Sequence, residues 1–310
     1  SFKLKQGIFF HDNDCFPKGK GRELVADDVI YTLKRFADIR VNTQSWFLLD
    51  EVVKGLDKFR KQSQQKGGID YDKTPIDGVK KKSKYEFTVT LKQKNPLFLY
   101  AFAASSLSIV PHEAVTHYGR KFAKNPVGTG PFTLEKYKKK QTMILHKNPA
   151  YHMTYPSEGS EQDKQQGLLA DAGKQLPLID EVHIHYVPEA QPEMLKFKKG
   201  ELFWIGLDRD NFLQMADKDR QGNFSLKGDY KDSYDLYVES SLHVSYMPIN
   251  LKDKVLGKNK WFRKAIAHAI DVKQRIDLLS NGRGIKLYSF VPHSIAGSER
   301  DIGTHGYDYN

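Results

Sequence analysis

The stretch 124–137, KNPVGTGPFTLEKY, limits most strongly how this chain can fold. Pro126 and Pro131 each fix φ at about −65° and lack an N–H donor. Gly128 and Gly130 can take backbone conformations that are closed to other residues. The residues that follow alternate apolar and polar, which predicts a strand entering a sheet. We therefore expect a stiff, bent turn that connects one packed unit to the next. An ordinary Gly/Pro hairpin inside a single domain is the alternative.

The size and composition of the chain indicate a globular protein of about two domains. It has 310 residues, with 39% hydrophobic and 12% aromatic residues. A domain takes roughly 150 residues, and no window approaches the ~20 apolar residues of a membrane helix. The first residues, SFKLKQGIFF, predict a strand and lack the parts of a signal peptide. We expect that both ends of the chain continue in a longer protein.

The single cysteine, Cys15, excludes an internal disulfide and leaves the cellular compartment open. A nucleophilic cysteine needs a nearby base. The candidate base, His11, lies on a predicted loop and has no other support. We therefore predict no catalytic role for Cys15.

The net charge of +11 raises the question of nucleic acid. The lysines form short runs at 80–82 and 138–140, where we predict turns between strands. Solvated turns explain these runs, and no helix-turn-helix, zinc-finger or RNP-type pattern accompanies them. We predict that nucleic acid is not a partner, and keep a nucleic-acid-binding protein as an alternative.

Periodicity and end signals predict the elements of the first half. A helix begins at Ala26, with acidic residues in its first turn and an apolar stripe of Val29, Leu33 and Phe36. The polar stretch 58–68 predicts a surface excursion. The other predicted elements are a hairpin at 79–91, a short buried helix at 97–102, a helix after Pro111, a hairpin of strands 132–137 and 142–147, and a covering loop at 151–175.

The second half has clearer helix ends than strands. Strands are predicted at 182–186, 201–205 and 234–246. Helices are predicted at 193–199, 211–216, 260–270 and from Asp271 to 281–282, with Gly200 ending the first and Asp208 capping the second. Strand, helix and strand in succession predict a crossover with some parallel pairing.

Two histidines, His183 and His185, share one face of the predicted strand 182–186. Such a pair can bind a metal ion. A metal-dependent hydrolase that uses Glu181 with these histidines is therefore one alternative. No third ligand stands at a recognisable spacing, so we predict solvent-facing histidines and no metal site.

Three stretches in this order resemble a known family. They are FKLKQGIFFHDN…ELVADDVIYTLKRFAD, NPVGTGPFTLEKY…NPAYH and NLKD…KNKWFRKAIAHAIDVKQRI…NGRG…VP. Together they resemble the family 5 extracellular solute-binding proteins, the peptide, oligopeptide and nickel receptors of ABC importers. The chain departs from the family in the loop CFPKGKGR, which is lengthened, and in the long segment 151–175.

The resemblance implies a mixed α/β (α+β) fold. Its lobes would be like those of type II periplasmic binding proteins, with an additional α+β domain. By that analogy residues 1–130 form the additional domain, 131–235 belong to the first lobe, and 236–310 begin an incomplete second lobe. Family members are considerably longer, which implies a fragment truncated at both ends.

The resemblance also implies a receptor rather than an enzyme. It would capture di- or oligopeptides in a cleft closed by hinge motion and deliver them to an ABC permease in the inner membrane. It would act as a monomer without a cofactor, in the periplasm or lipid-anchored at the cell envelope. A receptor of the same class for nickel, another metal chelate or haem is the alternative.

The ligand-binding residues are carried over by position in the family. Aromatic and amphipathic side chains suit a peptide cleft, because they give a large contact area and one polar group at little entropic cost. The alternative for each is a core aromatic or a structural cap. The candidates are Trp204, Gly206, His243, Tyr246 and Asn250, with Trp46 as a weaker one from the additional domain.

Overall fold

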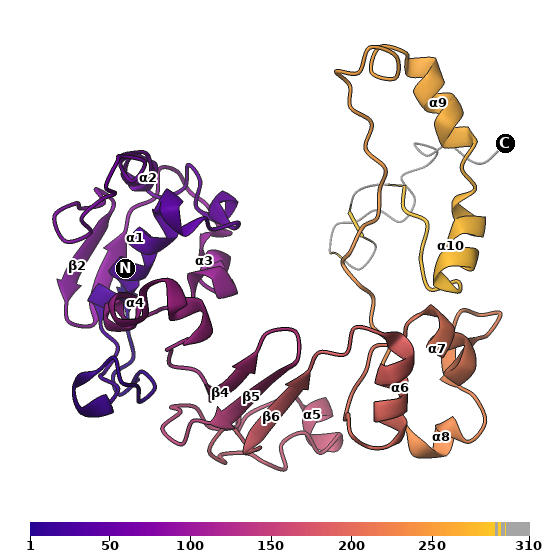
Figure 1. The fold of residues 1–310 in the computed structure, drawn as a ribbon, viewed down its shortest axis with the longest axis horizontal. Coiled ribbons are helices and arrows are strands. Elements are labelled where there is room, and N and C mark those ends of the chain that lie inside the picture. The colour runs from indigo at the N-terminus through magenta and orange to yellow at the C-terminus, as the bar shows by residue number, and fades with distance from the viewer. Residues whose placement is uncertain (289–290, 293–294, 296–310) are drawn as a thin grey trace. The chain divides into compact units, whose positions relative to one another are not determined.

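A computed structural model describes residues 1–288, 291–292 and 295 of the chain (Figure 1). The chain divides into two compact units, Ser1–Tyr186 and Val187–Asn310, which are described one at a time. Within the described residues, no helix is both long enough and apolar enough to cross a bilayer. The closing residues HGYDYN, predicted to lack a final element, lie outside the described part.

The first unit contains two antiparallel three-stranded sheets, ordered β1-β3-β2 and β4-β5-β6. Helices α1 to α4 lie with the first sheet, and α5 interrupts the long segment before β6 (Figure 1). The elements are β1 (Phe2–Lys3), α1 (Ala26–Ala37), α2 (Leu56–Gln62), β2 (Val79–Ser83), β3 (Glu86–Val89), α3 (Phe98–Ala101), α4 (His112–Tyr118), β4 (Phe132–Lys138), β5 (Thr142–Lys147), α5 (Glu161–Gln165) and β6 (Glu181–His185).

Helix α1 supplies much of the core of the first unit. Its predicted stripe is confirmed, because Val29, Leu33 and Phe36 are at most 3% exposed. The predicted surface excursion at 58–68 is wrong over α2. Leu56 and Phe59 lie three residues apart on one face of that helix and are buried in the same core as α1. Two apolar residues among lysines and glutamines are thus enough to anchor this short helix.

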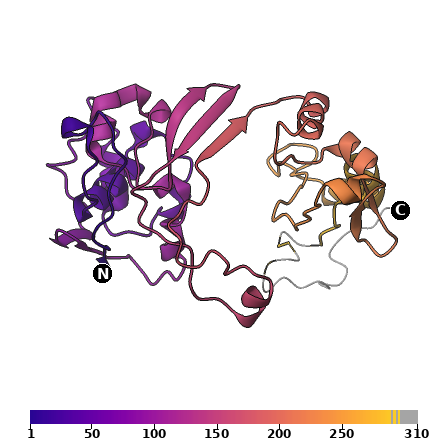
Figure 2. The same ribbon diagram turned by 90° about the horizontal axis from the view of Figure 1, so that it is seen from below.

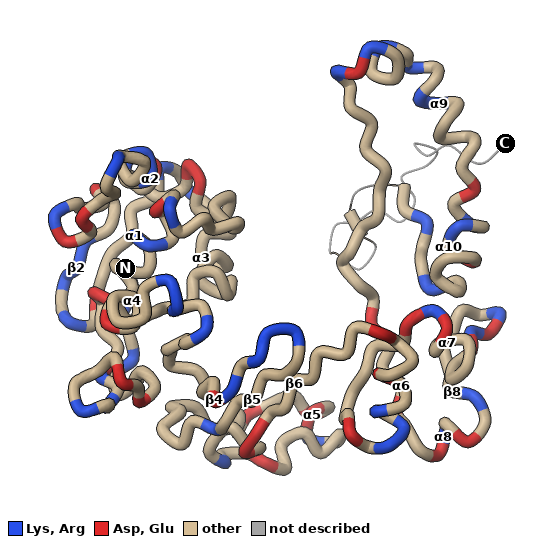
Figure 3. The backbone as a smooth tube through the Cα atoms, viewed as in Figure 1, with Lys and Arg blue, Asp and Glu red and all other residues tan. Residues whose placement is uncertain are grey.

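The lysine runs lie differently from the prediction. The run 80–82 belongs to strand β2 and not to a turn, and its side chains are exposed. The hairpin itself is confirmed, with Val79 paired to Val89. The run 138–140 lies at the end of β4 and in the following turn, as predicted. Lysine and arginine are spread along the whole chain, and the β4–β5 turn is one basic stretch among several (Figure 3).

The sheet β4-β5-β6 confirms the three strands predicted after the Gly/Pro stretch. Its strands lie side by side in both views (Figure 1, Figure 2). Thr133 pairs with His146, which in turn pairs with Glu181. A bulge between Leu134 and Lys136 shifts the register of β4. The segment 151–175 is mostly irregular, as predicted, apart from α5 and one bridge between Thr154 and Gln175.

The elements of the second unit from α6 to α8 pack around one apolar cluster, in which α9 and α10 take no part. Met194, Phe212, Met215, Ala216 and Leu226 form its buried part. The elements are α6 (Ala190–Lys198), α7 (Arg209–Met215), β7 (Ala216–Lys218), β8 (Phe224–Leu226), α8 (Tyr230–Ser233), α9 (Lys260–His268) and α10 (Val272–Ser280).

The predicted helix ends are confirmed. Gly200 follows α6 with a φ of 74°, and Asn281 ends α10 with a φ of 51°. The side chain of Asp208 accepts a hydrogen bond from the backbone N–H of Asn211 at 2.9 Å. Asp271 accepts one from Gln274 at 2.8 Å. The two aspartates accept backbone N–H groups that have no partner within their helices, and Gly200 and Asn281 end their helices in the left-handed conformation. All four depend only on residues close by in the sequence.

Two predicted strands are wrong. Neither 201–205 nor 234–246 forms a strand, and Phe203 and Trp204 are exposed rather than buried. Every strand pair in the described part is antiparallel, so the predicted crossover is also wrong. A strand needs a neighbour for its backbone groups, and an apolar run by itself does not supply one. The apolar side chains of the helix predicted at 260–270 are likewise not buried in α9, with Phe262 44% exposed.

Candidate functional site

The Gly/Pro turn is held by two polar side chains from outside it. The backbone N–H of His11 donates to the carbonyl of Gly128 at 2.8 Å, and the ring Nε2 lies 2.9 Å from the carbonyl of Gly130. The amide of Asn148, a buried residue, donates to the same Gly130 carbonyl at 3.0 Å. The turn therefore joins the loop before α1 to the end of β5.

The glycines of this turn do not have the role that the sequence suggested. Neither Gly128 nor Gly130 has a positive φ, and a Cβ at either position would meet no atom within 4 Å. The bend therefore comes from the prolines and from the bonds to His11 and Asn148. A hollow of about 360 Å³ adjoins the turn. Its lining residues are Asn13, Lys124, Asn125, Pro126, Leu134, Glu135 and Tyr137.

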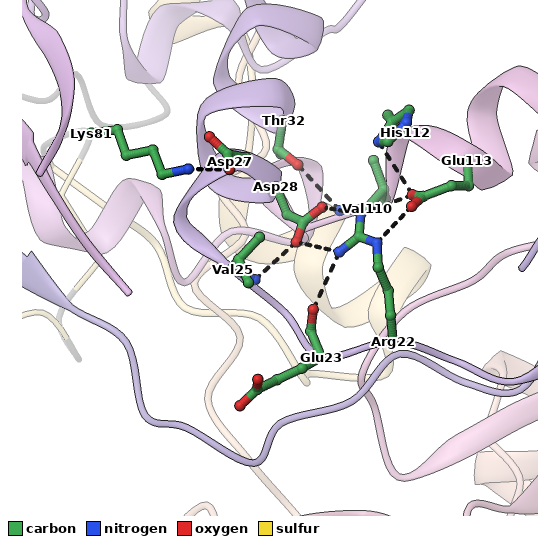
Figure 4. Close-up of polar contacts among 10 residues, drawn as sticks. All are labelled: Arg22, Glu23, Val25, Asp27, Asp28, Thr32, Lys81, Val110, His112 and Glu113. Carbon is green, nitrogen blue, oxygen red and sulfur yellow. Dashed lines mark hydrogen bonds and ion pairs between the residues drawn. The ribbon is translucent and has the colours of Figure 1, made fainter. Parts of the chain in front are cut away.

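Arg22 joins three segments of the first unit through one buried network (Figure 4). Its guanidinium donates to both carboxylate oxygens of Asp28 in α1, at 2.7 and 2.9 Å. It also donates to both oxygens of Glu113 in α4, at 2.6 and 2.8 Å. Asp28 is only 2% exposed and accepts a further bond from the backbone N–H of Val25. The network fixes the loop before α1 against both helices.

Hydrogen bonds between oppositely charged groups of this network shift the pKa values of Arg22 and Glu113. Hydrogen bonds with Asp28 and Glu113 raise the pKa of Arg22 despite its partial burial. Burial would raise the pKa of Glu113, but the hydrogen bonds from Arg22 outweigh it and hold that pKa below its usual range. Arg22 and Glu113 are therefore charged at neutral pH, and the network is structural.

Trp46, the candidate from the first unit, is half-buried against the core. Its indole N–H donates to Asp50 at 2.9 Å. The guanidinium carbon of Arg60 lies 4.5 Å from the ring centroid, and the ring of Phe36 packs at 6.1 Å. The polar group and one face of this ring thus have partners inside the unit.

Trp204 and Gly206 lie in the second unit between α6 and α7. Trp204 is 72% exposed, which leaves its ring open to a ligand. Gly206 is also exposed, and a side chain at that position would meet no atom within 4 Å. Space for a Cβ means that the fold of this unit does not require glycine at Gly206.

The other three candidates lie on an irregular stretch of the second unit. Tyr246 is 66% exposed, and His243 is exposed as well. Asn250 holds the turn after this stretch, because its side-chain oxygen accepts the N–H of Lys252 at 3.0 Å. Its own carbonyl accepts the N–H of Asp253 at 3.0 Å. Asn250 thus closes this turn with one side-chain and one backbone acceptor, while its own side chain stays exposed.

An acidic group in the first unit is compensated by a lysine. Asp50, Glu51 and Asp57 bring their carboxylates together. The ammonium of Lys92 lies 2.7 Å from Asp57 and also pairs with Glu51. A hollow of about 530 Å³ beside it is lined by polar and charged side chains. Lys92 thus offsets part of the negative charge of this exposed acidic group.

The histidine strand has neighbours that sequence spacing did not reveal. His183 lies 2.7 Å from Glu181, and His146 of β5 lies 3.3 Å from the same carboxylate. Glu135 of β4 contacts His146 as well. Hydrogen bonding to His183 and the nearby His146 hold the pKa of Glu181 below its usual range. His146 and Glu135 were missed because only the strand register brings them to this face.

Comparison with known proteins extends over the whole chain. The model of the bacterial extracellular solute-binding proteins, family 5 middle, matches residues 1–310. The dipeptide-binding protein of Escherichia coli K12 is 24% identical over 99% of this chain and 49% of its own length. The oligopeptide-binding protein AppA of Bacillus subtilis 168 is 24% identical over 99% of this chain and 46% of its own. The chain thus spans about half the length of the curated relatives it matches.

A solved structure shares the fold. The periplasmic binding protein DppA of Helicobacter pylori, in complex with the peptide STSA, aligns with a TM-score of 0.65 and 22% identity. The alignment covers 99% of this chain and 51% of that one. The predicted fold class, mixed helix and sheet like that of the peptide-binding proteins of this family, is confirmed. The matched relatives are described as binding proteins, and the family as extracellular. Because the family model matches every residue from 1 to 310, the chain belongs to the bacterial extracellular solute-binding proteins of family 5.

Proposed function

We propose that this protein is the substrate-binding receptor of an ABC importer for di- or oligopeptides. It captures the peptide in a cleft that hinge motion closes and delivers it to a permease in the inner membrane. The observation that carries the proposal is the family match over the whole chain, together with relatives named for dipeptide and oligopeptide binding. The receptor acts as a monomer, without catalysis or cofactor, in the periplasm or lipid-anchored at the cell envelope.

Exposed aromatic side chains of the second unit support this proposal. Trp204 and Tyr246 are each about two-thirds exposed or more, at 72% and 66%. Large amphipathic rings that are costly to leave in water suit the wall of a peptide site. Such a wall accepts many side chains, because contact area and not a specific charge supplies the affinity. We keep Trp204, Gly206, His243, Tyr246 and Asn250 as the proposed contacts, and Trp46 as a weaker one.

Of the proposed division into 1–130, 131–235 and 236–310, the apolar clusters support the first boundary. Three clusters of the first unit contain only residues up to Val127. The cluster of the second unit extends from Met194 to Leu236. Grouping by backbone contacts divides the chain after Tyr186 instead. Separate cores on the two sides of the Gly/Pro turn favour an additional domain that ends near residue 130.

Ligand capture needs no chemistry beyond binding and closure. A peptide that contacts both lobes only in the closed form shifts the equilibrium toward that form. The permease then recognises the closed receptor. Because the peptide binds the closed form more tightly than the open form, the fraction of closed receptor depends on the peptide concentration.

Calorimetry with the purified protein tests the proposal. We expect at least one di- to pentapeptide to bind with a Kd in the micromolar range or tighter. Trp204→Ala should weaken this binding about tenfold, the typical loss for an aromatic contact residue. Trp261→Ala is the matched control, because Trp261 is equally exposed, at 75%, and is not a proposed contact.

The same titration separates the alternatives. If a nickel chelate or haem binds and no peptide does, the protein is a receptor of the same class for that other ligand. Silence toward all three ligand types contradicts the proposal.

A further inference from the structure

The register of β5 and β6 gathers imidazoles and a carboxylate on one face of the sheet. His146 pairs with Glu181, and Ile144 pairs with His183. Directly paired residues of an antiparallel sheet share a face, as do alternate residues of one strand. His146, Glu181 and His183 therefore project from the same face, and His185 follows one step further along β6.

Glu181 lies between the two imidazoles. Its Oε1 is 3.3 Å from Nε2 of His146, and its Oε2 is 2.7 Å from Nε2 of His183. The exposed fractions of the three side chains are 42% for His146, 45% for Glu181 and 48% for His183. A dissolved ion can therefore reach these atoms without any movement of the backbone.

The bulge in β4 adds a second carboxylate. It falls between Leu134 and Lys136, and bulges commonly redirect a side chain. The carboxylate of Glu135, which is 57% exposed, contacts Nε2 of His146. Four potential ligand side chains from three adjacent strands thus form a chain of pairwise contacts, Glu135 to His146, His146 to Glu181 and Glu181 to His183.

We propose that this face binds one divalent transition-metal ion through His146, His183 and Glu181, with Glu135 as the fourth ligand. Imidazole nitrogen and carboxylate oxygen are established ligands of Zn²⁺, and imidazole also suits copper and nickel. In the structure a hydrogen bond joins Glu181 to His183, and ion-pair contacts join His146 to Glu181 and to Glu135. A divalent ion replaces these contacts when the exposed side chains rotate about their own torsions. The site shares no residue with the proposed peptide contacts, and the proposal does not depend on them.

Neighbouring charges place the ion at the Glu181 end of the face. Lys136 pairs with Ile144, and Lys138 pairs with Thr142, which lies opposite His185. Both lysines share the histidine face, Lys138 in the row of His185 and Lys136 in the row of His183, and both repel a cation there. Glu135 and Glu181 offset that repulsion only at the other end, which is why His185 is left out of the ligand set.

Zinc binding to the whole protein tests the proposal. The protein, freed of any affinity tag and stripped with a chelator, is titrated with Zn²⁺ alone in a calorimeter. We expect one ion per chain, and visible absorption bands of four-coordinate Co²⁺ when cobalt replaces zinc. His146→Ala and His183→Ala should each weaken zinc binding at least about tenfold. The double variant should show no saturable site.

A histidine elsewhere serves as the matched control. His117 on α4 is exposed, and its ring packs against Tyr118. His117→Ala should leave zinc affinity unchanged. Because all ligand side chains are exposed, circular dichroism should show native secondary structure in every variant. Absence of zinc binding by the unaltered protein would overturn the proposal, as would a double variant that binds zinc as tightly as the unaltered protein.

Discussion

At the scale of single residues, the ion pairs of Arg22 hold the loop before α1 against α1 and α4. Asp28 is almost fully buried, and its charge is tolerated because Arg22 neutralises it. Removing one partner of a buried ion pair leaves an uncompensated charge, which costs far more than an exposed pair contributes. The loop, α1 and α4 should therefore loosen together when Arg22 is lost.

Arg22→Met should lower the free energy of unfolding by about 3 kcal/mol, the lower end of the range for a broken buried pair. The lower end applies because 33% of the Arg22 side chain is exposed. Urea denaturation measures the change. Lys81→Met is the control, since the Lys81–Asp27 pair of Figure 4 is exposed and should contribute less than about 1 kcal/mol. Equal decreases in the free energy of unfolding of the two variants would contradict the prediction that the Arg22 network contributes more than an exposed ion pair.

His11 should make the Gly/Pro turn sensitive to pH. Its ring donates from Nε2 to Gly130 and accepts at Nδ1 from the N–H of Gly128, at 3.4 Å, which only the neutral form can do. Burial lowers the pKa of His11, partly opposed by the bond to Gly130. The unfolded chain then binds more protons, so this contribution is complete above about pH 6.5 and is lost as pH falls toward the folded pKa.

The pH dependence is measured by urea denaturation between pH 7.5 and pH 5, both chosen to bracket the ordinary histidine pKa of about 6.5. The unaltered protein should lose stability more steeply than His11→Gln, by at most about 1.4 kcal/mol per pH unit. Gln keeps one donor and one acceptor but does not titrate. Identical slopes for the two proteins would contradict a neutral, buried His11.

At the scale of elements, local signals predicted helices better than strands. The caps at Asp208 and Asp271 and the end at Gly200 depend on residues within one helical turn. The local sequence is therefore sufficient to predict these helix ends. The stretches 201–205 and 234–246 carry strand-forming residues, but a strand exists only where another strand pairs with it. Pairing partners lie far along the chain, and no local pattern predicts their presence.

The cap of α7 allows a direct test at this scale. Asp208→Ala removes the acceptor for the N–H of Asn211 and should destabilise the helix by about 0.5–2 kcal/mol. Because Phe212 and Met215 of α7 are buried in the core of the second unit, amide hydrogen exchange across α7 should become faster. Asp208→Asn should restore most of the protection. Asp210→Ala, in the same first turn but outside the cap, should have a smaller effect.

At the scale of the whole molecule, three separated sequence stretches were sufficient to predict the family and the fold. The proposed contacts are harder to predict, because a binding wall depends on which side chains the packing leaves exposed. Trp204 was expected within the strand 201–205 and instead lies on an exposed loop, where it can contact a ligand. The exposure of Tyr246 was not evident from its aromatic neighbourhood in the sequence either. His146 and Glu135 show the same limit, since only strand register brings them together.

The most direct measurement for the central claim is a crystal structure of the protein with a peptide that calorimetry has shown to bind. We expect electron density for the peptide in contact with the rings of Trp204 and Tyr246. Density for a bound peptide that touches neither ring would contradict the proposed site.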